Sequence, residues 1–115
     1  MHEWAHHRLK VWRDSLLLVE RIYQMTRTFP KDETFGLIGQ MQRAAVSIPS
    51  NIAEGAGRGG KREMRRYLLI ARGSLAELDT QIILARKLGY VTDATYEREL
   101  CQEIFAMLNG LIKVQ

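Results

Sequence analysis

Residues 61–88 read KREMRRYLLIARGSLAELDTQIILARKL and carry the longest helical pattern in the chain. Apolar side chains recur there in alternating steps of three and four residues, which keeps them on one face of an α-helix. That line consists of Leu68, Ala71, Leu75, Leu78, Ile82 and Ala85. Gly89 follows directly and is typical of a helix C-terminus. We therefore predict a long helix over 61–88 that buries one apolar face.

Three further segments show the same periodicity, at 10–28, 36–56 and 93–113. Pro49 lies inside the second of them and predicts a kink, because proline removes one helical hydrogen bond. Residues 55–60 read Gly-Ala-Gly-Arg-Gly-Gly, which predicts a loop before the long helix. Four helices with short connections indicate an all-α fold, an up-down-up-down four-helix bundle that occupies residues 1–115 as one domain.

Composition excludes several classes of protein. The chain has 115 residues, of which 46% are hydrophobic and 26% charged, as in ordinary globular domains. The single Cys101 excludes an internal disulfide and a multi-cysteine zinc site. No apolar run approaches the roughly 18 residues of a membrane span, and the N-terminus does not resemble a signal peptide. We expect a cytoplasmic protein without membrane contact.

Two of the predicted helices carry a second apolar line outside the main one. In the long helix this line is formed by Leu69, Ala76 and Ile83, and the last helix adds Cys101, Phe105 and Ile112. A helix that is apolar on two sides normally packs on two sides. The pattern fits either a deep core in a compact bundle or a subunit interface at Leu69, Ala76 and Ile83.

The positive charge of the chain is concentrated in one segment. The net charge is +4, but residues 58–72 hold six arginine and lysine residues against Glu63 alone. The rest of the chain is close to neutral. Cations at a helix start favour phosphate contacts. The candidates for nucleic-acid binding are Arg58, Lys61, Arg62, Arg65 and Arg66. The alternative is a solvated face without a ligand.

A polar stripe borders the apolar face of the second helix. It contains Gln40, Arg43, Ser47, Asn51 and Glu54. The long helix carries Arg72 and Glu77 around Gly73 and Ser74, small residues that permit close helix approach. We predict that Arg43, Ser47, Asn51, Glu54, Arg72 and Glu77 form a buried structural polar network. In a catalytic alternative, Glu54 would act as an acid or a base.

Motifs for catalysis and for cofactors are weak. Gly55, Gly57 and Gly60 fit the G-x-G-x-x-G spacing, but a helix precedes them where the dinucleotide fingerprint needs a strand. His2 and His6 have the i, i+4 spacing of metal ligands, without an acidic or cysteine partner. No serine has an evident histidine partner. We expect no catalytic residues, no metal and no cofactor, and therefore no enzyme.

Several motifs in order resemble the four-helix-bundle family named for proteins encoded in 23S rRNA intervening sequences. The strongest is RAAVSIPSNIAEG at 43–55, followed by Gly57 and Arg58. The others are LKVW at 9–12, FPKDETFGL at 29–37, ARGSLAEL at 71–78 and LNGLIK at 108–113. The chain departs from the family pattern at two places. Ile38-Gly39 stands where the family often has a polar start of the second helix, and Gly59-Gly60 makes the loop before the long helix unusually rich in glycine.

The resemblance implies that the bundles assemble as a homopentamer, in a ring. The family is similar to the accessory variability proteins of diversity-generating retroelements, which bind a reverse transcriptase and nucleic acid through a basic surface. Together with the charge pattern, this predicts a non-enzymatic homo-oligomer that binds RNA or DNA at the start of the long helix. The alternative is a protein-interaction scaffold, for example an adaptor for a reverse transcriptase.

Overall fold

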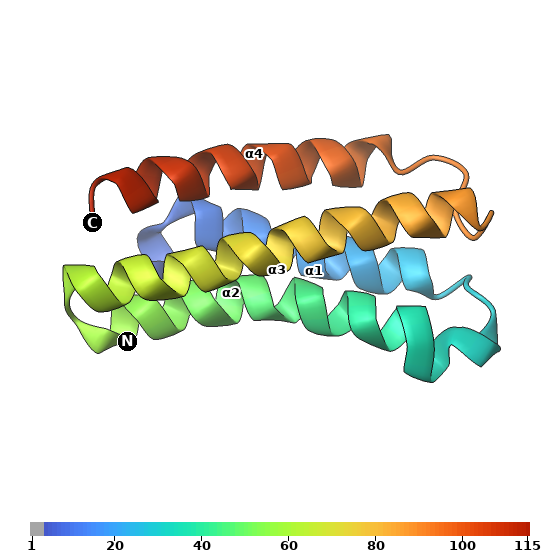
Figure 1. Ribbon diagram of the computed structural model, residues 1–115, viewed down its shortest axis with the longest axis horizontal. Coiled ribbons are helices and arrows are strands. Elements are labelled where there is room, and N and C mark those ends of the chain that lie inside the picture. The colour runs from blue at the N-terminus through green and yellow to red at the C-terminus, as the bar shows by residue number, and fades with distance from the viewer. Residues whose placement is uncertain (1–3) are drawn as a thin grey trace.

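The computed structural model describes residues 4–115, and these residues form a bundle of four α-helices without a strand (Figure 1). The helices are α1 (Lys10–Thr26), α2 (Gly39–Arg58), α3 (Lys61–Lys87) and α4 (Thr95–Lys113). They run alternately in opposite directions, and α1 also packs against α4, which closes the bundle. The expected all-α four-helix bundle is confirmed, and its long axis measures 43 Å.

The connection between α1 and α2 differs from the prediction, which began the second helix at residue 36. A short 3₁₀ turn (Lys31–Glu33) and a π-type turn (Thr34–Ile38) precede α2, and Gly36 has non-helical dihedral angles. The Glu33 carboxylate holds the turn, because it accepts hydrogen bonds from the Leu37 N–H at 3.3 Å and from the Tyr90 hydroxyl at 2.9 Å. Periodicity did not signal this boundary, since Leu37 and Ile38 continue the apolar pattern.

The predicted loop over residues 55–60 is wrong, because α2 continues through Arg58. Only Gly59 and Gly60 connect α2 to α3, and Gly59 has a φ of +83°, which suits glycine. Gly55 serves packing instead. A Cβ atom at this position would lie 2.9 Å from the Tyr67 Cβ and 3.3 Å from the Met64 Cα. Glycine therefore lets α2 and α3 approach closely at this level.

The core lies where the pattern of the long helix predicts it. All six residues of the α3 line are buried, together with Leu18 and Ile22 from α1, Ile48 and Ile52 from α2 and Ile104 and Leu108 from α4. Pro49 is buried inside α2. Gly89 has a φ of +79° and ends α3 as predicted, with the Tyr90 N–H bonded to the Ala85 carbonyl at 2.9 Å.

The start of α4 lies two residues later than predicted. Asp93 does not begin the helix, but its carboxylate accepts a hydrogen bond from the Thr95 N–H at 3.0 Å. Hydrogen bonds from Thr95, first from its side chain and then from this N–H, lower the pKa of Asp93, because they stabilise the charged form. No helix in residues 4–115 is long and apolar enough to cross a membrane.

Gly55 and Gly57 offer a matched test of helix packing. Gly55→Ala should lower the free energy of unfolding by about 1–3 kcal/mol, because the added methyl group overpacks the contact with α3. Gly57→Ala should raise it by up to about 1 kcal/mol, because a Cβ there meets nothing within 4 Å and alanine favours the helix. Urea denaturation at one protein concentration measures both values. Equal effects of the two substitutions would contradict the packing role of Gly55.

Candidate nucleic-acid interface

One end of the bundle is strongly basic. We call it the basic end and define it by residues 4–14, 54–66 and 105–115, which hold nine arginine and lysine residues and three carboxylates. Figure 1 shows why these segments meet: α1 and α3 begin where α2 and α4 end. The charge pattern of the sequence indicated only the part from Arg58 to Arg66. It missed Arg8, Lys10, Arg13 and Lys113, which the alternation of the helices brings to the same end.

Helix dipoles do not explain the charge of this end. The starts of α1 and α3 are partly positive, but the ends of α2 and α4 beside them are partly negative. Arg65 lies between α3 and α4, and its Nη1 donates to the Ile112 carbonyl at 3.0 Å, near the end of α4. The positive potential therefore comes from the side chains rather than from the backbone.

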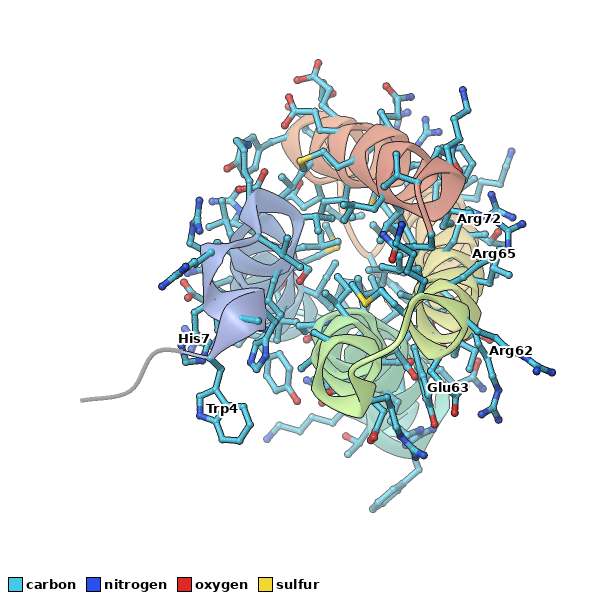
Figure 2. The ribbon with its side chains drawn as sticks, turned by 90° about the vertical axis from the view of Figure 1, so that its left-hand side faces the viewer. Trp4, His7, Arg62, Glu63, Arg65 and Arg72 are labelled. Carbon is cyan, nitrogen blue, oxygen red and sulfur yellow. The ribbon has the colours of Figure 1, made fainter. Side chains whose placement is uncertain are left out.

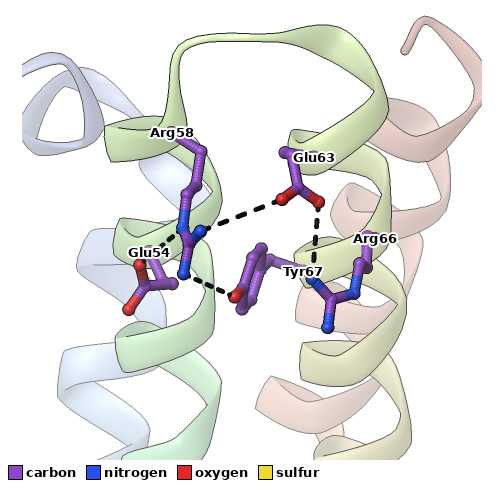
Figure 3. Close-up of polar contacts among 5 residues, drawn as sticks. All are labelled: Glu54, Arg58, Glu63, Arg66 and Tyr67. Carbon is purple, nitrogen blue, oxygen red and sulfur yellow. Dashed lines mark hydrogen bonds and ion pairs between the residues drawn. The ribbon is translucent and has the colours of Figure 1, made fainter.

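Two of the five candidate residues belong to a compact cluster of opposite charges (Figure 3). The Arg58 guanidinium donates to the Glu54 carboxylate at 3.0 Å and to the Tyr67 hydroxyl at 3.1 Å. Arg66 pairs with Glu63 at 3.5 Å, and both guanidinium groups lie over the Tyr67 ring. The pKa of Arg58 is raised, mainly because its hydrogen bond to Glu54 stabilises the charged guanidinium. Two arginines and two glutamates leave this cluster with little net charge.

Lys61 and Arg62 are different, because they are exposed and form no ion pair with another residue of 4–115. Figure 2 looks onto the basic end and shows Arg62 pointing away from the bundle, with Arg65 and Arg72 on the same side of α3. Lys61, Arg62 and the partly engaged Arg65 thus make up the portion of the candidate set whose charge is available to an anion.

The predicted buried polar network is not assembled within one chain. Ser47 hydrogen-bonds Ser74 across α2 and α3 at 2.8 Å, and Asn51 donates to the Ser47 carbonyl, also at 2.8 Å. Glu54, however, pairs with Arg58 at the surface. The other three predicted members, Arg43, Arg72 and Glu77, lie apart from this group.

Arg72 donates to Asn109 of α4 at 2.9 Å, whereas Arg43 and Glu77 are exposed and form no ion pair in the described part of the chain. The prediction is wrong on burial, because the stripe lies at the rim of the α2–α3 contact. Glu54 as a catalytic acid or base gains no support from this position, since its carboxylate is half exposed and held by Arg58.

Ala76, the middle residue of the second apolar line of α3, borders a groove between α3 and α4. Leu69 and Ile83 are partly buried, and Ala76 is exposed at the groove wall. The groove has a volume of about 380 Å³, and Phe105 lies opposite Ala76 with 43% of its surface exposed. Cys101 and Ile112 are buried in the core. The structure therefore places Ala76 and Phe105 along one groove, and it places Cys101 and Ile112 in the core.

Groups suited to covalent or metal chemistry are few in the described residues. No group of three histidine, cysteine or carboxylate side chains in residues 4–115 has the arrangement of a metal site. His2 of the considered histidine pair lies outside the described residues. Cys101 is 3% exposed, and burial raises the pKa of its thiol to about 12. The thiol is a packing group.

Comparison with known proteins identifies a family that the chain matches over most of its length. The model of the 23S rRNA-intervening sequence protein family matches residues 7–110. No curated protein matches the chain. The match includes all four helices except the end of α4.

The raised pKa of Cys101 predicts slow thiol chemistry. At pH 8 a thiol with a pKa of about 12 is roughly one part in ten thousand thiolate, whereas an unfolded cysteine is about a quarter thiolate. Ellman's reagent should therefore label the native protein at least about a thousandfold more slowly than the protein in guanidinium chloride. Equal labelling rates in the two conditions would show that the α3–α4 contact opens readily.

Proposed function

The chain belongs to the 23S rRNA-intervening sequence protein family, and from this premise and the charge of the basic end we propose that it is a non-enzymatic protein that binds nucleic acid. The observation that carries the proposal is the excess of nine cationic side chains over three carboxylates in the basic end. Phosphate backbones attract such a surface without reading base sequence. The ligand is RNA or DNA, and Lys61, Arg62 and Arg65 make its main contacts.

The pairing of the arginines supports unequal roles among the candidate residues. Arg58 and Arg66 are held by Glu54 and Glu63, so that a phosphate would have to compete with a carboxylate for each of them. Lys61 and Arg62 have no such competitor in residues 4–115. We assign Arg58 and Arg66 a secondary contact, made when the ligand already occupies the neighbouring cations.

We further propose that the bundle assembles as a homo-oligomer, a pentamer according to the family resemblance, through the α3 line Leu69, Ala76 and Ile83. The groove beside Ala76 and the exposed Phe105 ring support this, because a second copy would cover both. A ring would repeat the basic end around its axis. Weak contacts to one strand would then add through multivalency.

A protein-interaction scaffold, such as an adaptor for a reverse transcriptase, is the second candidate function. It is favoured by Phe35, which is 95% exposed in the turn before α2, at the end of the bundle opposite the basic end. An exposed aromatic ring of this kind is typical of protein contacts. In this case the basic end would meet an acidic protein surface.

Lys61 and Arg62 test the nucleic-acid proposal directly. The double variant Lys61→Ala, Arg62→Ala should weaken binding to labelled RNA or duplex DNA. It should also reduce the slope of log affinity against log salt by about one for each residue, because each cation neutralises about one phosphate. Fluorescence anisotropy over a salt series measures both quantities.

The matched control for this variant is Arg86→Ala, Lys87→Ala, which removes the same charge from the other end of α3. It should leave the salt slope nearly unchanged. Equal losses in the two double variants would mean that only net charge matters. An absence of binding at low salt would refute the nucleic-acid proposal and favour the scaffold.

Ala76 tests the assembly. Ala76→Glu places a charge at the groove wall without disturbing the core, because Ala76 is exposed in the single chain. Light scattering after size exclusion should show an oligomer for the unchanged protein and a smaller species for the variant. Ala106→Glu on the exposed surface of α4 is the control and should keep the oligomer. A monomeric unchanged protein, or an Ala76→Glu oligomer of full size, would contradict the proposed interface.

A further inference from the structure

An aromatic cluster lies at the basic end, in a place that periodicity did not indicate. It is formed by Trp4, His6, His7 and Trp12. Trp4 precedes the 3₁₀ turn η1 (Ala5–Arg8), which holds the two histidines, and Trp12 lies in the first turn of α1. The His6 and His7 ring centroids each lie 5.0 Å from that of Trp12, and the Trp4 ring lies 6.2 Å from His6. The four aromatic rings thus form a connected cluster of tilted and edge-to-face contacts on the flank of the bundle.

The outermost ring of this cluster is largely open to solvent. Trp4 is 64% exposed, whereas His6, His7 and Trp12 are partly buried beneath it. Figure 2 shows Trp4 at the edge of the basic end, on the side away from Arg62. The core does not account for an indole ring in this position, because Trp4 lies outside the set of apolar residues that pack together. Its free surface is available to a flat ligand.

The support beneath Trp4 is fixed by hydrogen bonds. The backbone N–H of Trp4 donates to His7 Nδ1 at 3.3 Å, and Arg13 Nη1 donates to the His7 carbonyl at 2.9 Å. The turn η1 also packs against α2 and is therefore part of the bundle. The indole is therefore carried at the start of an ordered turn, and the Arg13 guanidinium is bonded to the same turn.

We propose that Trp4 stacks an unpaired base of a single-stranded nucleic acid whose phosphates follow the basic end. A positively charged surface with an exposed aromatic ring is the combination that single-strand-binding proteins use, since every base has a π face. A duplex offers no free base face inside its stack, so the site selects single strands or unpaired loops. This inference rests on the proposed function and adds to it the class of ligand.

Intrinsic fluorescence reports on this site, because Trp4 and Trp12 are the two tryptophans of the sequence. The probes are an oligothymidylate and an oligouridylate of about 12 nucleotides and an abasic strand of equal length. The strands with bases should quench the emission, and the abasic strand should not. Trp4→Ala should weaken the binding of the strands with bases about 5- to 100-fold, and that of the abasic strand much less.

Phe35→Ala is the matched control, because it removes an exposed aromatic ring from the opposite end and should leave both affinities unchanged. Circular dichroism establishes that each variant is folded, and Trp4→Phe should recover part of the affinity. Strand binding without quenching, or equal weakening of basic and abasic strands by Trp4→Ala, would overturn the stacking site while nucleic-acid binding stands. No binding of any strand at low salt would overturn both proposals.

Discussion

The close contact between α2 and α3 sets both the length of the turn that joins them and the charge pairing beside that turn. Gly55 lets the backbone of α2 approach Tyr67 and Met64, and the Ser47–Ser74 hydrogen bond holds the two helices together further along. With the helices this close, two residues suffice to connect them. The short turn places Arg58, at the end of α2, within reach of Tyr67 and Glu63 on α3. The packing of α2 against α3 therefore determines which charged side chains pair beside the turn.

The alternation of the four helices then sorts the charges of the chain. Segments far apart in sequence contribute cations to one end, and carboxylates are comparatively rare there. The local pairing decides what these cations can do. Arg58 and Arg66 already share Glu54, Glu63 and the Tyr67 ring, whereas Lys61 and Arg62 face the solvent without a partner in residues 4–115. The number of cationic residues in a segment therefore overstates the positive charge that a ligand can meet there.

The helices and the core of α3 are predictable from the sequence, because burial imposes a strict periodicity on Leu68 to Ala85. The prediction is wrong where one residue type serves two purposes. Glycine signals a loop, but Gly55 and Gly57 are helical, and only Gly59 and Gly60 end α2. The polar stripe of α2 was visible, but periodicity does not decide whether Glu54 meets Arg58 or Arg72. The Trp4 cluster escaped notice, because a short 3₁₀ turn has no repeating pattern.

If the basic end is the surface that meets nucleic acid, photochemical crosslinking should locate the ligand there. The protein would be irradiated with a 4-thiouridine-containing RNA and a thiothymidine-containing DNA, and the modified peptides identified by mass spectrometry. We expect crosslinks within residues 4–14 and 54–66 and few near the turns at 27–38 and 88–94. Crosslinks concentrated at those turns, or none above the level of an unrelated acidic protein, would contradict this expectation.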